Sequence, residues 1–202
     1  MKSDIYKFER AVTDIDSISE IVSKIAGYNG LDNKQELRLN LLCEELLEML
    51  PNLLVYGNGE FWIENKGSLY ELHAAVEADE LLSGESMETI LAVSKTGRNA
   101  AAVGIMGRIR IAAEMMLARY AQSVGTSGAK SVDPCDGLLD KGRFADPIGY
   151  TNEWSLEKYR TQVTKGSGAW DELEKSIIAN MADDVTVGIM GGRVEITVKK
   201  RL

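Results

Sequence analysis

Two stretches in which apolar and polar residues alternate, each broken by a glycine turn, constrain the fold of this 202-residue chain most. In the first, Phe61 and Ile63 alternate with polar neighbours, an Asn-Lys-Gly turn follows, and Leu69 to Glu77 forms a partner strand. In the second, residues 185–198 repeat the pattern around a Gly-Gly pair. Alternating strands joined by a tight glycine turn form an antiparallel hairpin. We therefore expect a sheet built largely from hairpins.

Helical periodicity separates these hairpins. The strongest helix is predicted over residues 33–50, where Pro51 should end or kink it, and its apolar residues recur at mostly three and four residue steps: Leu39, Leu42, Leu46, Met49 and Leu50. A strand over residues 4–12 and a helix with Ile18, Ile21, Val22 and Ile25 precede it. Further helices are predicted at 104–124, 156–163 and 169–181. This order predicts an α+β two-layer sandwich, a mixed, mostly antiparallel sheet with helices on one face and solvent on the other.

The length suits a single domain spanning residues 1–202. Residues 125–149 are rich in Gly, Ser, Asp and Pro and show little periodicity, so we expect a loop insertion there.

The charge of the chain excludes one class of partner. A formal net charge of −8 argues against nucleic-acid binding, which depends on clustered Lys and Arg. The first residues lack the apolar run of a signal peptide, and no segment approaches the ~18 apolar residues of a membrane span. These patterns predict a cytoplasmic protein without a membrane segment. Cys43 and Cys135 are expected to be reduced thiols, because neither has Cys or His companions at metal-binding spacing.

The only histidine, His73, lies in the first hairpin on the opposite face of its strand from Tyr70, Leu72, Ala74 and Val76. We therefore expect it to face solvent, and we do not assign it as a catalytic base, since no Ser or Cys nucleophile is visibly paired with it.

The order of elements and three local stretches resemble the GHKL ATPase fold, and within it the anti-sigma-factor serine kinases and the ATPase domains of histidine kinases. The stretches are LRLNLLCEELLEML at 37–50, LYELHAAVEADE at 69–80 and ANMADDVTVGIMGGRVEITVKKRL at 179–202. In that family, the first is a helix that carries a general base and a magnesium ligand, and the second ends near the residue that reads adenine.

The resemblance implies roles for three acids of the 37–50 helix. Glu44 or Glu45 would be the catalytic base, and the residue four positions on would hold Mg²⁺, where the family has Asn. After Glu45 that residue is Met49, a poor ligand for a hard cation, whereas after Glu44 it is Glu48. Helical geometry instead places Glu44 and Glu48 toward the face opposite Leu46, where an acidic pair would simply be solvated. Both interpretations remain open.

The nucleotide-binding residues implied by the resemblance lie in the middle of the chain. Asp79 stands where the family reads adenine, although only Gly84 follows where the family has two spaced glycines. A glycine-rich, basic stretch leading into the 104–124 helix would hold the phosphates, through Lys95, Gly97, Arg98, Gly104, Gly107 and Arg108. Alternatively, Gly104 and Gly107 let the helix pack closely against the sheet.

The resemblance thus implies a cytoplasmic regulatory protein that binds ATP and Mg²⁺, or a degenerate relative that acts through protein binding. An active form would transfer phosphate from ATP to a serine of a partner of the sigma-factor or anti-sigma antagonist type. A homodimer is also compatible with this family. The alternative is an interaction or scaffold module that binds no nucleotide.

Overall fold

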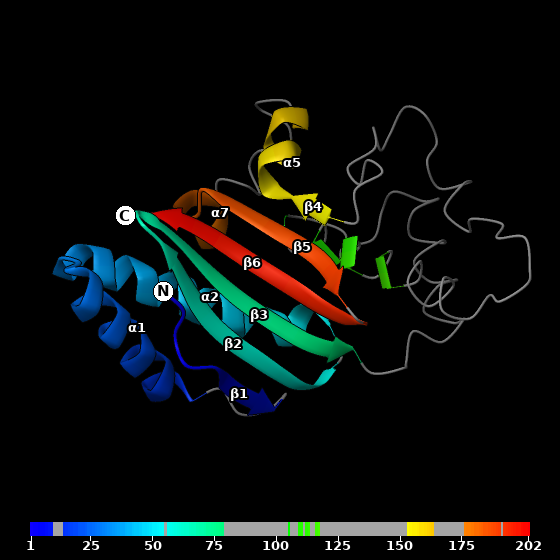
Figure 1. The fold of residues 1–202 in the computed structure, drawn as a ribbon. Helices are drawn as coiled ribbons and strands as arrows, with labels where there is room; N and C mark the ends of the chain where they lie inside the picture. The colour runs from blue at the N-terminus through cyan, green and yellow to red at the C-terminus, as the bar shows by residue number, and fades with distance from the viewer. Residues whose placement is uncertain are drawn as a thin grey trace, which may run out of the picture.

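The computed structural model describes residues 1–9, 14–54, 56–78, 153–163, 176–190 and 192–202, together with positions 105, 109, 110, 112, 113, 116 and 117. Figure 1 shows these parts as one sheet with helices packed behind it. The expected insertion at 125–149 lies outside the described residues, as do Asp79, Lys95, Gly97, Arg98, Gly104, Gly107 and Arg108.

The described strands form one six-stranded sheet in the order β1-β2-β3-β6-β5-β4. Every neighbouring pair is antiparallel, so the α+β prediction is confirmed, but the expected mixed sheet is not found among the described strands. Tight turns require this direction for β2–β3 and β5–β6, because a two-residue turn can join only antiparallel strands. The strands are β1 (Tyr6–Glu9), β2 (Tyr56–Lys66), β3 (Leu69–Ala78), β4 (Glu153–Ser155), β5 (Asp184–Met190) and β6 (Arg193–Arg201).

Both hairpins predicted from sequence are present. The β2–β3 turn places Gly67 at φ 72°, and the β5–β6 turn places Gly192 at φ 82°. Glycine adopts positive φ without the steric cost that a Cβ imposes. The two hairpins join through β3 and β6, which pair along the middle of the sheet.

The described helices are α1 (Ile15–Asn29), α2 (Asn33–Leu53), α5 (Leu156–Gln162) and α7 (Ile177–Met181). The N-terminus of α2 is fixed by a capping box between Asp32 and Gln35. Pro51 lies inside α2, which continues only to Leu53, so the expected stop falls within one turn of the proline. The helix expected at 169–181 does not run continuously, because Ser176 is extended and caps a helix that begins at Ile177.

The helices cover one face of the sheet. In Figure 1, α2 runs behind the sheet and α1 lies beside it at the left; α2 contacts α1, β3 and α7. The core holds the inward residues of the central strands, such as Leu72, Val185 and Ile196, and the buried side of α2, including Leu46 and Leu50. The described positions between 105 and 117 are helical, and all of them except Arg110 are buried in the same core.

A cationic side chain joins α5 to the end of α7. The guanidinium of Arg160 donates hydrogen bonds to the carbonyl oxygens of Ala179, Ala182 and, at 3.0 Å, Asp183. Ala179 lies within α7 and the other two residues follow its last turn, and a cation is favoured at this end of a helix. Among the described residues, no helix is long and apolar enough to cross a membrane.

Candidate functional site

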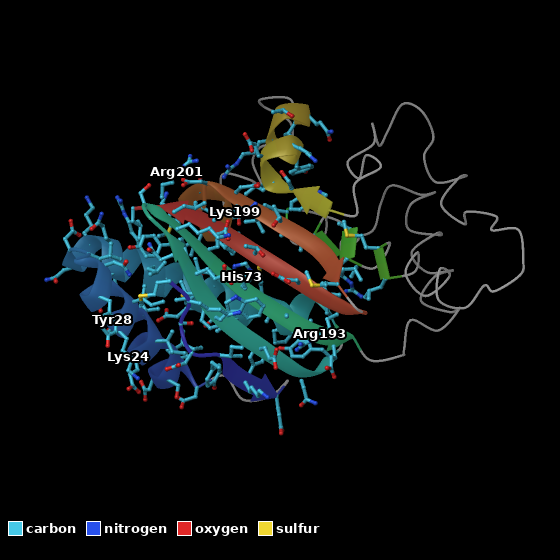
Figure 2. The ribbon with its side chains drawn as sticks, viewed as in Figure 1. Lys24, Tyr28, His73, Arg193, Lys199 and Arg201 are labelled. Atoms are coloured by element: carbon cyan, nitrogen blue, oxygen red, sulfur yellow. The ribbon has the colours of Figure 1, made fainter. Side chains whose placement is uncertain are left out.

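The open face of the sheet carries a row of polar side chains in strand register. Trp62 of β2 lies opposite His73 of β3, and His73 lies opposite Thr197 of β6. Residues at alternate positions of a strand share a face, so these side chains lie on the side away from the helices. Figure 2 shows His73 near the middle of this face, with Arg193 toward one end of the sheet and Lys199 and Arg201 toward the other.

His73 is on the predicted face but is not exposed to solvent as expected, since only 9% of its surface is accessible. Its ring stacks on the ring of Trp62, with centroids 4.8 Å apart and an interplanar angle of 3°. Its Nδ1 lies 2.8 Å from Glu195 Oε1 and 3.1 Å from Thr197 Oγ1. Cross-strand neighbours therefore bury the imidazole, although none of the described helices covers this face.

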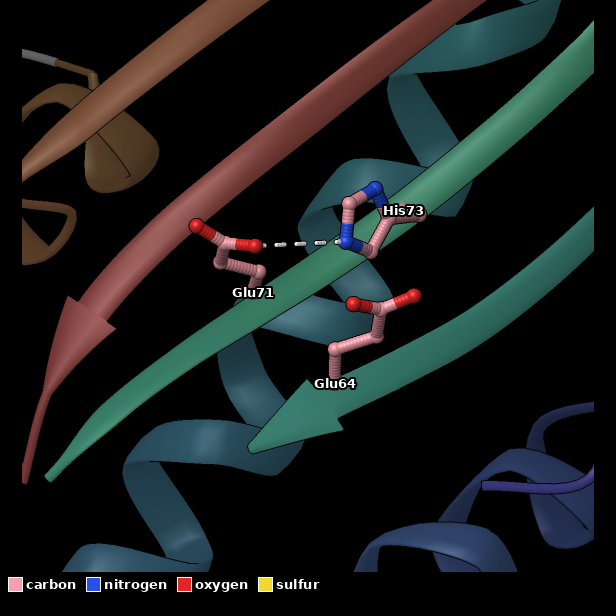
Figure 3. Close-up of side chains that lie close together, drawn as sticks. All are labelled: Glu64, Glu71 and His73. Carbon is pink, nitrogen blue, oxygen red and sulfur yellow. Dashed lines mark ion pairs between the residues drawn. The ribbon is translucent and has the colours of Figure 1, made fainter. Parts of the chain in front are cut away.

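The other ring nitrogen of His73 faces two carboxylates. Nε2 is buried without a hydrogen-bond partner, and it lies 3.7 Å from Glu71 Oε2, beyond hydrogen-bonding distance. Ligand atoms of Glu64, Glu71 and His73 all lie within 4.8 Å of one another (Figure 3). Within the part of the chain that the structure describes, this is the group of acidic, Cys and His side chains close enough to hold a metal ion.

Two cations and an indole accompany these carboxylates. Lys66 Nζ lies 2.5 Å from Glu71 Oε2 and 3.8 Å from Glu64 Oε2, and the pKa of Lys66 is raised by its hydrogen bond and charge interaction with Glu71. Burial raises the pKa of Glu64, but the hydrogen bond from the Trp62 indole and the charges of His73, Lys2 and Lys66 outweigh it and hold that pKa below its ordinary value. Glu64 is therefore held as a carboxylate.

Helix α2 carries the acids that the family resemblance singled out. Glu44 and Glu45 are half-buried, at the border between the packed and the solvent-facing sides of the helix, and Glu48 is exposed. Burial raises the pKa of Glu45, and the nearby charges of Glu48 and Glu44 raise it further. A raised carboxyl pKa is common at catalytic bases and also arises wherever acids crowd together.

Met49, one turn after Glu45, is part of the core with only 3% of its surface accessible. This position therefore packs against apolar neighbours and offers no oxygen ligand. Cys43 is likewise a buried free thiol, and burial raises its pKa well above the ordinary value, which makes it a poor nucleophile.

The structure thus groups the α2 acids with one another and places the open-face cluster on the opposite side of the sheet. The predicted phosphate-binding residues lie outside the described residues, and Ile105 and Ile109, which flank Arg108 in sequence, join the same core as Leu46 of α2. Sequence patterns did not identify the open-face cluster as a site, although the hairpin register places Trp62 beside His73.

Comparisons with known proteins do not identify a family for this chain. No family model matches the chain, and no curated protein or solved structure is significantly similar to it.

Proposed function

We propose that this chain is a cytoplasmic regulatory protein of the GHKL ATPase type, which binds ATP at an altered site and acts through a protein partner. The observation that carries the proposal is the half-buried Glu45 on the long helix behind an antiparallel sheet, with a carboxyl pKa raised by burial and by its acidic neighbours. A carboxyl group with a raised pKa suits the role of a general base.

The arrangement of elements supports the same proposal. Helix α2 packs against β3, the strand that leads directly into Asp79, the proposed adenine-reading residue. The helical residues around Arg108 share the core that α2 enters. The described residues next to the proposed adenine-reading and phosphate-binding positions therefore belong to the same helix–sheet layer as the proposed base, which supports a nucleotide site between them.

The altered character of the proposed site rests on Met49. The family position for the magnesium-binding amide is occupied here by a thioether that is buried in the core. Magnesium prefers oxygen ligands and retains several waters, so a site without this amide would hold the metal weakly. We therefore expect ATP binding with little phosphate transfer, and a function exerted mainly through partner binding.

Thermal unfolding with increasing Mg-ATP tests the proposal. A ligand that binds only the native state raises the melting temperature as its concentration increases. At a free ligand concentration of 100 times Kd, the free energy of unfolding rises by about 2.7 kcal/mol. We expect such a shift in the wild type and its loss in the Lys95→Ala/Arg108→Ala double variant. The matched control is Lys34→Ala/Arg38→Ala, which removes two exposed positive charges from the first turns of α2.

The burial of Met49 also favours the second candidate, an interaction module that binds no nucleotide. Absence of any shift at millimolar Mg-ATP would support this module and reject the ATP-binding proposal. An equal loss of the shift in both double variants would show that general charge, and not the glycine-rich segment, holds the nucleotide.

A further inference from the structure

A buried histidine nitrogen without a partner lies among carboxylates on the open face of the sheet. His73 Nε2 is hidden from solvent, accepts and donates no hydrogen bond, and points toward Glu71 (Figure 3). A buried polar atom left unpaired costs about 1–3 kcal/mol. We infer that Glu64, Glu71 and His73 form a binding site for a divalent transition-metal ion of the Zn²⁺ class.

The hydrogen bonds of His73 prepare Nε2 to act as a ligand. An ionised carboxylate only accepts hydrogen bonds, so Glu195, 2.8 Å from Nδ1, places the ring proton on Nδ1. When the ring is neutral, its lone pair is then on Nε2, the atom that faces the two carboxylates. Histidines that bind metals commonly donate their other N–H to a carboxylate in this way.

The two carboxylates are also held in place by their surroundings. The indole N–H of Trp62 donates to Glu64 Oε1 at 3.1 Å, and Glu71 extends from the strand position two residues before His73 on the same face. The ligand atoms lie within 4.8 Å of one another, which side-chain rotation can close to the spacing of ligands around one ion. Coordination would tie β2 to β3 across the open face.

Lys66 shows that this position accepts positive charge. Its ammonium contacts both Glu64 and Glu71, but its side chain remains more than half exposed, so it can turn out into solvent. A divalent ion would replace one charge with two between the same carboxylates. Lys66 is therefore the expected competitor for the metal.

The ligand set selects the class of metal. One imidazole nitrogen with two carboxylates suits Zn²⁺ and related ions, whereas Mg²⁺ prefers oxygen ligands and water, and no thiolate is present among the three side chains to favour a soft ion. The cluster lies on the sheet face opposite α2, so this inference does not depend on the proposed nucleotide site.

Titration of the intact protein with Zn²⁺ tests the site. Because His73 is the only histidine, ¹⁵N NMR of labelled imidazole reports this ring alone. All proteins carry Cys135→Ser, which removes a competing thiol ligand. We expect one Zn²⁺ per chain by calorimetry and a large shift of the Nε2 resonance at matching concentrations, with no shift from Mg²⁺. An Nε2 resonance that stays unchanged when Zn²⁺ saturates the protein would overturn the inference.

Variants test whether Zn²⁺ binds at these three residues or to acidic side chains in general. We expect His73→Asn and Glu71→Gln to abolish the calorimetric signal, and Glu195→Gln to weaken binding by about 10–100-fold. Lys66→Met should tighten binding by removing the competitor. Glu77→Gln, on the same face of β3 and outside the cluster, is the control and should bind as the wild type does. Wild-type affinity in folded Glu71→Gln protein, or equal weakening of binding in Glu71→Gln and Glu77→Gln, would reject the inference.

Discussion

The rings of Trp62 and His73 stack across β2 and β3, with their planes 3° apart and their centroids separated by 4.8 Å. The two residues are direct partners in the strand register. The ammonium of Lys2 lies 4.4 Å from the centre of the same indole, so the ring contacts a cation as well as the imidazole. These contacts hold the imidazole in place, with its Nδ1 within hydrogen-bonding distance of Glu195 and Thr197 of β6.

The first prediction concerns the energy of this stack. Cross-strand aromatic pairs contribute about 0.5–1.5 kcal/mol beyond the area they bury. A double-mutant cycle with Trp62→Leu and His73→Leu should therefore give a coupling free energy of about 1 kcal/mol in urea unfolding. A second cycle that pairs Trp62→Leu with Glu77→Gln should be additive, because Glu77 lies four residues along β3 from His73. Coupling of equal size in both cycles would contradict a specific stack.

The second prediction concerns acid unfolding and Glu195. The hydrogen bond from His73 lowers the pKa of Glu195 below its ordinary value of 4.5, although burial opposes this change. A native pKa below the unfolded value means that ionised Glu195 stabilises the fold above the unfolded value, and that this stability is lost as pH falls through the native value. Glu195→Gln should therefore be less stable than wild type at neutral pH, and the difference should shrink below pH 4.5.

Urea unfolding at a series of pH values measures this effect. In a His73→Asn background, Glu195→Gln should change the pH dependence much less, because the main cause of the lowered pKa is absent. An unchanged pH dependence of the difference in that background would show that His73 is not the cause.

The third prediction contrasts two glycines. Gly59 of β2 lies opposite Phe8 of β1, and a Cβ at Gly59 would meet the Phe8 ring at Cζ, at Cε2 and, at 2.9 Å, at Cε1. Gly59→Ala should therefore displace Phe8 from the core and destabilise the protein by about 1–3 kcal/mol.

Gly27 in helix α1 is the matched control. A Cβ there meets nothing within 4 Å, and alanine is a better helix former than glycine. Gly27→Ala should stabilise the protein by about 0.5–1 kcal/mol. Thermal unfolding of both variants measures the contrast, and similar changes of the same sign would be inconsistent with the Phe8–Gly59 contact.

The hairpins were predictable because their signals are local. A period of two residues on each side of a glycine turn specifies pairing, register and face, so the sides of Phe61, Ile63 and Leu72 were assigned correctly. The long helix was predictable for the same reason, from the spacing of its apolar residues. In contrast, the break before α7 depends on Ser176, whose capping role is evident only once its backbone is extended.

The open-face cluster needs information that no short stretch contains. Glu195 is 122 residues from His73 in sequence, and their contact follows from the pairing of β3 with β6. A solvent-facing position was therefore a reasonable expectation for His73 from its own strand. The partial signal was the first hairpin, in which the register of Trp62 and His73 places an aromatic ring beside the only histidine.

The final prediction concerns Met49. The resemblance to the GHKL family implies an amide side chain at this position, whereas the packing of α2 requires an apolar one. An asparagine there would restore the family's amide, but it would also place a polar group at a position where only 3% of the residue's surface is accessible to solvent. Losing the apolar contacts and burying an unpaired amide should cost about 2–4 kcal/mol. Met49→Leu, which keeps the volume and polarity, should cost less than about 1.5 kcal/mol.

Urea unfolding with and without Mg-ATP compares the two variants. We expect Mg-ATP to raise the stability of Met49→Asn no more than that of Met49→Leu, because the amide would face the core. A selective gain in Met49→Asn would instead mean that this helix position reaches the nucleotide's metal, and that the methionine replaces a working ligand.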